Sequence, residues 1–368
     1  MKLKRLFSEQ VRGVSDKVPF ISPEAMERRL GEKFLLRVGA NESNFGPSPR
    51  VALAMRNAIE MAHQYGDPEG MDLRKLLAEK FSMDSNSVAL GSGIDDLLGL
   101  FVRLFVDPGE KVVTSMGAYP TFNYHVEGFG ARLYRVPYVN DKEDIVRLSH
   151  AVQSENAKMV YLANPDNPMG TWHEKDELEW FVNNIPSKCI ILIDEAYSDF
   201  APQIALLNPN STPKNVIHLR TFSKAYGMAG ARIGYALCHE EICLGLDKIR
   251  NHFGVNRIAQ AGAISALSDD SYVKWVIKEV AEGKKFYEHL ALELDFSVIP
   301  SATNFIAMDL GSTKCATEFF SELIKRRVFV RMPSVFPLNR CIRITIGPVD
   351  ERRQVAEAIR SSWQDLQK

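Results

Sequence analysis

The sequence has almost no net charge and no long apolar run. Its 45 Lys and Arg residues nearly balance its 46 Asp and Glu residues, which gives a formal net charge of −1. No basic cluster is present that could follow a phosphate backbone, so we expect no nucleic-acid partner. The most apolar segment, residues 97–106, is too short to cross a bilayer and contains Arg103. We therefore expect no membrane span either.

Cysteine is scarce and shows no paired spacing. The five cysteines are odd in number and scattered, which is typical of a reducing compartment rather than of a disulfide framework. Cys238, His239 and Cys243 lack a second pair of ligands, so we expect core packing there and no metal. The basic start of the chain is followed by polar residues where a secretory signal needs an apolar stretch. These features predict a cytoplasmic protein.

The chain is too long for one hydrophobic core, and its pattern is that of an α/β protein. Short β-branched runs alternate with amphipathic helical patterns, which predicts a mostly parallel sheet flanked by helices. The expected strands, all interpreted as buried on both faces, are 111–115, 159–163, 189–193, 216–219 and 232–237. The expected helices are 94–106, 174–183 and 271–294.

The pattern changes after the long helix, in the last third of the chain. Here the sequence predicts a small α+β domain with strands at 296–299, 304–310, 328–331 and 341–346, and helices at 317–326 and from 350. We therefore predict three parts. They are an N-terminal arm that belongs with the small domain (1–37), a large domain (38–265) and a small C-terminal domain (266–368).

One lysine lies in an unusual place. Lys224, within the segment Thr221–Arg232, follows one predicted buried strand and precedes another. A lone lysine most often lies on the surface. Here Ser223 and Arg232 flank it with a hydroxyl and a guanidinium, which suit a phosphate dianion. Upstream, Gly91–Asp96 ends a short strand and opens an apolar helix, so its backbone N–H groups would face an anion.

Polar side chains also follow two other predicted strands. Asp194 ends a strand at the edge where open α/β sheets bind ligands, and an acid there is an N-cap, a metal ligand or a cofactor partner. A carboxylate beside a pyridine nitrogen keeps that nitrogen protonated, and Tyr197 would reach a ring hydroxyl. Asn167 lies in a Pro/Asn turn after another strand. Four motifs at successive strand ends predict one shared crevice.

Taken together, these motifs resemble those of the fold-type I pyridoxal-phosphate aminotransferases of class I/II. Within that group the chain is most similar to the histidinol-phosphate aminotransferase branch, and the resemblance covers nearly the whole chain. The matching segments are Gly39–Ser43, Gly46–Pro49, Tyr65–Pro68, Gly91–Asp96, Tyr119, Asn164–Pro168, Asp194–Tyr197, Ser223–Arg232, Asn304–Phe305 and Arg343–Gly347. So many segments in one order make the resemblance specific.

The resemblance implies a cofactor site in the large domain. Lys224 would carry pyridoxal 5′-phosphate as a Schiff base, Asp194 would pair with the pyridine nitrogen, and Tyr197 and Asn167 would hold the ring hydroxyl. We expect Lys224, Asp194 and Tyr197 to be the catalytic residues. The other implied cofactor contacts are ring stacking by Tyr119, phosphate binding by Gly93, Ile94, Asp95, Ser223 and Arg232, and Tyr65 from the neighbouring subunit of a homodimer.

The same resemblance implies the substrate side. Arg343 matches the arginine that grips the substrate α-carboxylate, Asn41 and Asn304 would line the cleft, and Arg331 matches a family arginine that meets the distal group. The expected partners are a small-molecule amino donor and a keto-acid acceptor, 2-oxoglutarate, used in turn by a ping-pong mechanism. The segment Val18–Glu24 lacks the tyrosine usual in the family, so the residues alone leave the donor open between histidinol phosphate and an aromatic amino acid.

Other functions share these residues. A related decarboxylase, such as a threonine-phosphate decarboxylase, or a carbon–sulfur lyase would use the same cofactor contacts, and only product analysis separates them. A sensor module of this fold is disfavoured, because it needs an attached DNA-binding domain. Glu143 shows no such pattern, and we interpret it as part of a solvated face.

Overall fold

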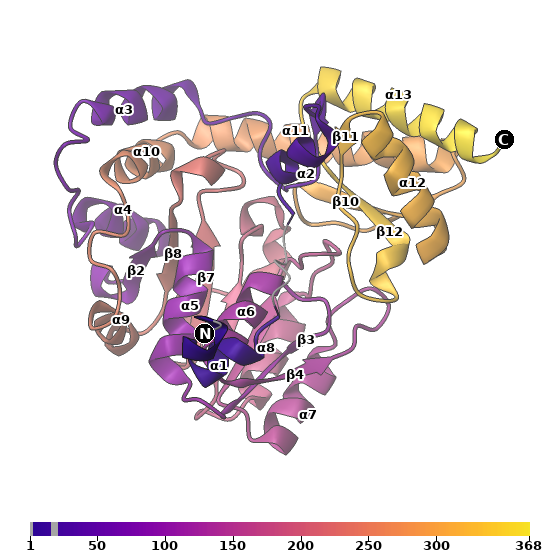
Figure 1. Cartoon of the computed structure of the whole chain (residues 1–368). Coiled ribbons are helices and arrows are strands. Elements are labelled where there is room, and N and C mark those ends of the chain that lie inside the picture. Colours follow the sequence, from indigo (N-terminus) through magenta and orange to yellow (C-terminus); the bar gives the residue numbers. More distant parts are fainter. Residues whose placement is uncertain (1–2, 16–20) are drawn as a thin grey trace.

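The computed structural model describes residues 3–15 and 21–368 of the chain (Figure 1). Val18–Phe20, the first part of the segment that lacks a tyrosine, lie outside the described residues. A seven-stranded sheet forms the centre of the fold. In spatial order its strands are β2 (Val88–Gly91), β8 (Gly234–Leu237), β7 (Val216–Thr221), β6 (Ile190–Asp194), β5 (Met159–Ala163), β3 (Lys111–Ser115) and β4 (Arg132–Val136).

The large sheet is mostly parallel, as predicted, and helices cover both of its faces. Alternate residues of each buried strand point to opposite faces, so Val112 packs into one apolar cluster and Val113 into another. One face is covered by α5 (Ile94–Phe105), α6 (Pro120–Gly128) and α9 (Glu240–Asp247). The other is covered by α7 (Ile145–Glu155) and α8 (Lys175–Asn184), with α4 (Met71–Phe81) and α10 (Arg257–Leu267) beside β2 and β8.

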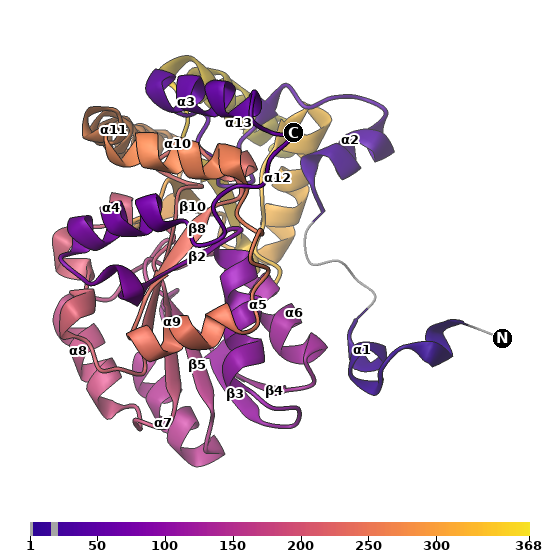
Figure 2. The ribbon, with the colours of Figure 1, turned by 90° about the vertical axis from the view of Figure 1, so that its left-hand side faces the viewer.

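A second, antiparallel sheet is built from the last third of the chain. Its strands are β12 (Cys341–Thr345), β10 (Phe305–Asp309) and β9 (Ser297–Ile299), in that spatial order. They pack with α11 (Asp270–Glu293), α12 (Thr313–Lys325) and α13 (Val349–Leu366), as Figure 1 shows at the yellow end of the chain. The remaining α-helices of the described residues are α1 (Glu9–Gly13), which Figure 2 shows at the periphery, α2 (Pro23–Leu30) and α3 (Pro49–Ile59).

An early segment of the chain joins this C-terminal part. β1 (Leu36–Arg37) pairs in parallel with β11 (Val328–Phe329). Just beyond β1, the carbonyl of Val38 accepts a hydrogen bond from the Thr345 backbone N–H at 2.7 Å. The chain then turns at Asn41, whose φ of 56° lies in the left-handed region. These contacts place Asn41 between the seven-stranded sheet and the three-stranded C-terminal sheet.

The structure corrects several expected elements. β8 begins at Gly234 and runs antiparallel to both of its neighbours, whereas its buried apolar sequence gave no sign of direction. β4 was not predicted because it is an edge strand with a mostly exposed, polar face. α12 begins four residues before the predicted 317, because Ser312 caps it by accepting from the Cys315 N–H at 3.2 Å. β11 ends at Phe329, before the predicted 331.

Among the described residues, no helix has the length and apolar composition needed to cross a membrane.

The turn after Lys224 gives a test of this packing. Gly227 has a φ of 68°, and a Cβ at this position would collide with the carbonyl group of Gly46. Gly31 has a similar φ of 76° but open space around it. We predict that Gly31→Ala lowers the free energy of unfolding by about 1 kcal/mol, the cost of the backbone conformation, and Gly227→Ala by roughly 3 kcal/mol or more. Equal losses in urea unfolding would contradict the described turn.

Candidate active site

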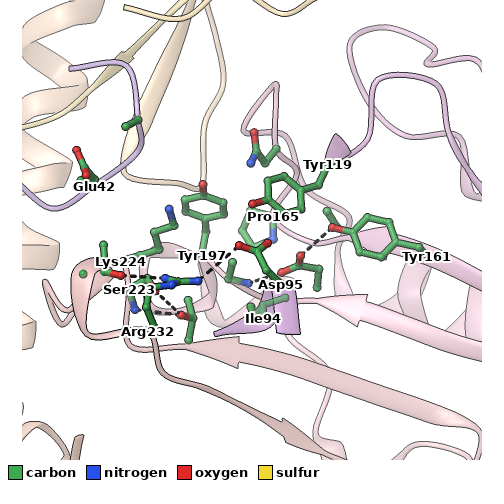
Figure 3. Close-up of a pocket in the computed structure, with 18 residues that line it drawn as sticks. Glu42, Ile94, Asp95, Tyr119, Tyr161, Pro165, Tyr197, Ser223, Lys224 and Arg232 are labelled. Atoms are coloured by element: carbon green, nitrogen blue, oxygen red, sulfur yellow. Dashed lines mark hydrogen bonds and ion pairs between the residues drawn. The ribbon is translucent and has the colours of Figure 1, made fainter. Parts of the chain in front are cut away.

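Four of the expected polar residues meet at one edge of the large sheet. Asp194 is the last residue of β6, Asn167 follows β5 and Lys224 follows β7. Because β8 is antiparallel to β7, its first residue lies at this same edge, and Arg232 just precedes it. All four line one cavity of about 390 Å³. Figure 3 shows Lys224 and Arg232 among the side chains that line it. The shared crevice predicted from strand ends is therefore present in the fold.

Asp194 is a buried carboxylate with two hydrogen-bond donors. The Tyr161 hydroxyl donates to its Oδ2 at 2.7 Å, and the Ala196 backbone N–H donates to its Oδ1 at 3.0 Å. Burial raises the pKa of Asp194 from 3.8 to about 6, although these hydrogen bonds and the charge of Lys224 act to lower it. The side chain is therefore mostly ionised at pH 7 in spite of its burial.

Lys224 and Tyr197 meet above this carboxylate, around Asn41. The Lys224 amine donates to the Asn41 carbonyl oxygen at 3.0 Å and lies 5.5 Å from the centre of the Tyr197 ring. The Asn41 amide Nδ2 in turn donates to the Tyr197 hydroxyl at 2.9 Å. Asn41 thus fixes both groups through its backbone and its side chain.

The first turn of α5 supplies a place for an anion. Gly93 precedes the helix with a φ of 91°, and a Cβ there would collide with the Arg232 guanidinium. Ile94 and Asp95 open the helix and line the cavity. Arg232 lies 3.5 Å from Asp95 Oδ2, and the Ser223 hydroxyl, which accepts from Thr221 at 2.9 Å, lines the same end of the cavity. N–H groups, a guanidinium and a hydroxyl therefore converge there.

A second cavity of about 270 Å³ adjoins the first and shares part of its wall. The shared residues include Tyr119, Asn167, Tyr197 and Lys224. Tyr119 stands before the first residue of α6, and burial raises the pKa of its hydroxyl well above the ordinary value, so the ring stays neutral. A molecule that extends from one cavity into the other would pass Lys224.

Two arginines enter the second cavity from neighbouring backbone positions. The backbones of Arg331 and Arg343 bridge the two residues through two hydrogen bonds of 3.3 and 2.6 Å. Arg343 donates to Asn167 Oδ1 and packs over Phe305 at 5.0 Å, while its Nε is buried without a hydrogen-bond partner in the described chain. Burial lowers the pKa of Arg343 to about 10, so it remains a cation at pH 7.

Two expected site residues lie elsewhere. Asn304 does not line either cavity and is buried behind Asn41, where its Nδ2 donates to the Glu42 carbonyl at 3.1 Å. Tyr65 is 78% exposed and packs its ring against Phe253 at 4.6 Å, outside the cavity of its own chain. Asn304 therefore supports the cleft backbone, and Tyr65 is available to a neighbouring molecule.

The interpretation of Glu143 as a solvated residue is wrong. Its side chain is buried, and burial together with the nearby Asp166 raises its pKa well above the ordinary value. Asp166 accepts from the Met169 N–H at 2.9 Å and from the Tyr138 hydroxyl at 2.8 Å, and its own pKa is raised to about 6, chiefly by burial. Glu143 and Asp166 thus form a buried pair of acids beside the turn that contains Asn167. No local sequence pattern predicts this pair.

Comparison with known proteins identifies the family. The family model described as aminotransferase class I and II matches residues 33–359. The chain belongs to this family. As an aminotransferase, it is an enzyme that acts on small molecules. A histidinol-phosphate aminotransferase from Carboxydothermus hydrogenoformans is 34% identical over 92% of this chain and 94% of its own length.

Solved structures agree with this assignment. The aminotransferase superposes with a TM-score of 0.95 on the crystal structure of histidinol-phosphate aminotransferase from Sinorhizobium meliloti in complex with pyridoxal 5′-phosphate. The two chains are 46% identical, and the match covers 98% of each. An aspartate aminotransferase from Thermus thermophilus, 20% identical with a TM-score of 0.83, shares the fold over 97% of this chain and 99% of its own. The predicted fold-type I architecture is confirmed.

The raised pKa of Asp194 predicts that the free energy of unfolding of the ligand-free aminotransferase depends on pH. Because this pKa is higher in the folded state, the folded protein binds more protons than the unfolded chain between about pH 4 and pH 6. The free energy of unfolding therefore falls as the pH rises through this range. We expect Asp194→Asn to remove that loss, so that its free energy of unfolding relative to the wild type rises by at most about 3 kcal/mol between pH 4 and pH 7.

Urea unfolding of both proteins at pH 4 and pH 7 measures this difference. The variant should gain stability relative to the wild type from pH 4 to pH 7, whatever the difference at pH 4. The titration of Asp166, which is present in both proteins, does not contribute to this change. A variant that is equally destabilised at both pH values would show that burial does not control the ionisation of Asp194.

Proposed function

We propose that this aminotransferase moves the amino group of histidinol phosphate, or of an aromatic amino acid, to 2-oxoglutarate by a ping-pong mechanism. Its cofactor is pyridoxal 5′-phosphate. Relatives that cover almost the whole chain carry the name histidinol-phosphate aminotransferase. The observation that carries the proposal is the pair of adjoining cavities, one lined by Asp194 and the other by Arg343, with Lys224 in the wall of both.

The larger cavity has the polar groups that this cofactor needs. Asp194 offers a carboxylate for the pyridine nitrogen. The first turn of α5 and Arg232 offer donors for the phosphate, at a place where only a glycine leaves room for the guanidinium. Asn41 Oδ1 and Arg343 Nε are buried without partners among the described residues, as expected of groups that a bound molecule satisfies.

In the proposed mechanism the chain's own residues bind the ligands and move one proton. When bound, the cofactor supplies an electron sink for the bond that breaks at the substrate Cα. Lys224 carries the proton to and from that carbon, and the Asn41 carbonyl holds the amine in place. Tyr197 and Asn167 orient the ring hydroxyl, and Tyr119 covers the ring and excludes water.

The substrate side of the proposal uses the two arginines. Arg343 is half-buried and its guanidinium is planar, which suits a bidentate pair with the α-carboxylate of 2-oxoglutarate. Arg331 lines the same cavity, packs over the Phe329 ring at 5.2 Å and would meet the phosphate of histidinol phosphate or the distal carboxylate of 2-oxoglutarate. Two adjacent cations in one cavity favour substrates that carry two negative charges, as a phosphate monoester or a dicarboxylate does.

A homodimer is part of the proposal. The exposed Tyr65 would reach the cofactor phosphate of the neighbouring subunit, and its backbone is held by a 2.6 Å hydrogen bond from Arg257.

We also propose a cytoplasmic location, which the five free cysteines support.

A panel of amino donors tests the proposal. We predict that glutamate forms from 2-oxoglutarate fastest with histidinol phosphate, more slowly with aromatic amino acids, and not at all with Lys224→Ala. Arg331→Gln should raise the KM of the phosphorylated donor at least tenfold, while Arg343→Gln should do so for 2-oxoglutarate, because each loses a charge-assisted contact. The exposed Arg353 provides the control, Arg353→Gln, which should change neither value.

Product analysis separates the alternatives. Release of carbon dioxide without glutamate would overturn the transfer reaction in favour of a decarboxylase. Full activity with aromatic donors and none with histidinol phosphate would contradict the proposed phosphate contact.

A further inference from the structure

Tyr161 lines the larger of the two adjoining cavities but has no role in the mechanism proposed above. It lies in the middle of β5, is fully buried and lines the larger cavity (Figure 3). In the register of the sheet, Ala163 of β5 pairs with Asp194 of β6. Tyr161 is two residues before Ala163, so its side chain points to the same face as that of Asp194. The phenol spans the diagonal between them and donates to Asp194 Oδ2 at 2.7 Å.

The Tyr161 ring has little freedom to turn away. It stacks on the ring of Phe122 in α6, with centroids 4.5 Å apart and planes 17° from parallel. Burial and the adjacent Asp194 charge raise the pKa of the Tyr161 hydroxyl well above its ordinary value. The hydroxyl therefore keeps its proton at physiological pH and acts as a fixed donor.

Two donors, on different elements, together define the plane of the Asp194 carboxylate. The Tyr161 hydroxyl takes Oδ2, and the Ala196 N–H in the turn after β6 takes Oδ1. Each oxygen of a carboxylate accepts more than one hydrogen bond, so both retain acceptor capacity towards the cavity. A donor to the charged form also offsets part of the cost of burying the ion.

We propose that Tyr161 is a positioning residue that holds Asp194 ionised and oriented towards the ring nitrogen of the cofactor. The inference rests on the proposed function, in which Asp194 pairs with that nitrogen. A purely structural role would reside in the stacked ring, whereas the positioning role resides in the hydroxyl. Replacing Tyr161 by phenylalanine separates the two, because the ring and its stack with Phe122 remain.

The matched control is a buried tyrosine elsewhere. Tyr287 in α11 is fully buried, and its hydroxyl has no hydrogen-bond partner in the part of the chain that the structure describes. Tyr287→Phe therefore removes the same atom from the interior without touching the cavity.

The first readout is the ionisation of Asp194 in the cofactor-free protein, followed by ¹³C NMR of labelled aspartate carboxyls and assigned with Asp194→Asn. Because burial raises the pKa of Asp194 to about 6, we expect the wild-type carboxyl to titrate near that value. Tyr161→Phe should raise it further, because the ionised form loses a donor. Tyr287→Phe should leave it unchanged. An unaltered pKa in Tyr161→Phe would overturn the positioning role.

The second readout is the dissociation constant of pyridoxal 5′-phosphate, measured by equilibrium dialysis at pH 7.5. Tyr161→Phe should weaken binding about tenfold, and it should have no added effect in an Asp194→Asn background, because the two side chains act through one contact. Equal weakening in both backgrounds would overturn the inference. If the wild type itself bound no cofactor, the proposed function would fail instead, while the NMR titration would still decide the Tyr161–Asp194 contact.

Discussion

The burial of one negative charge, Asp194, is the constraint on which the rest of the site depends. A carboxylate at the end of a fully buried strand is unstable unless donors and a cation lie within reach. The chain supplies a phenol from β5, a backbone N–H from the turn after β6, and Lys224 from the segment after β7. Each of these comes from a different strand or from the segment that follows it, so the charge is tolerated only when the strands are assembled in this order.

The antiparallel direction of β8 brings Arg232 to the same edge of the sheet, beside the first turn of α5, where we propose that the cofactor phosphate binds. A parallel β8 would begin at the opposite edge and take Arg232 away from the cavity. Because β8 is antiparallel, the chain stays at this edge from Lys224 to Arg232, and the guanidinium lies against Gly93 at the start of α5. The early segment at Asn41 then ties this edge to the C-terminal sheet, from which Arg343 reaches Asn167. In the proposed function, the cofactor and the substrate would therefore lie against the same side chains, which line both cavities.

The local sequence was sufficient to predict most of the central strands and the polar residues that follow them. β3, β5, β6 and β7 are buried apolar runs bounded by polar turns, so their positions and the residues at their ends could be predicted to within a residue or two. The direction of β8 could not be predicted, because the sequence of a buried apolar strand does not show whether its neighbours are parallel or antiparallel to it. Tyr161 was counted only as a strand residue and Glu143 as a surface one. Their roles arise from contacts across strands and loops, which a single sequence does not display.

The identity of the lysine that holds the cofactor tests the central claim most directly. Borohydride reduction of the protein loaded with pyridoxal 5′-phosphate, followed by peptide mass spectrometry, marks the lysine that is covalently joined to it. The account predicts a single modified peptide containing Lys224. Modification of another lysine instead, such as the half-buried Lys284, whose pKa burial lowers to about 8, would contradict the assignment of the site.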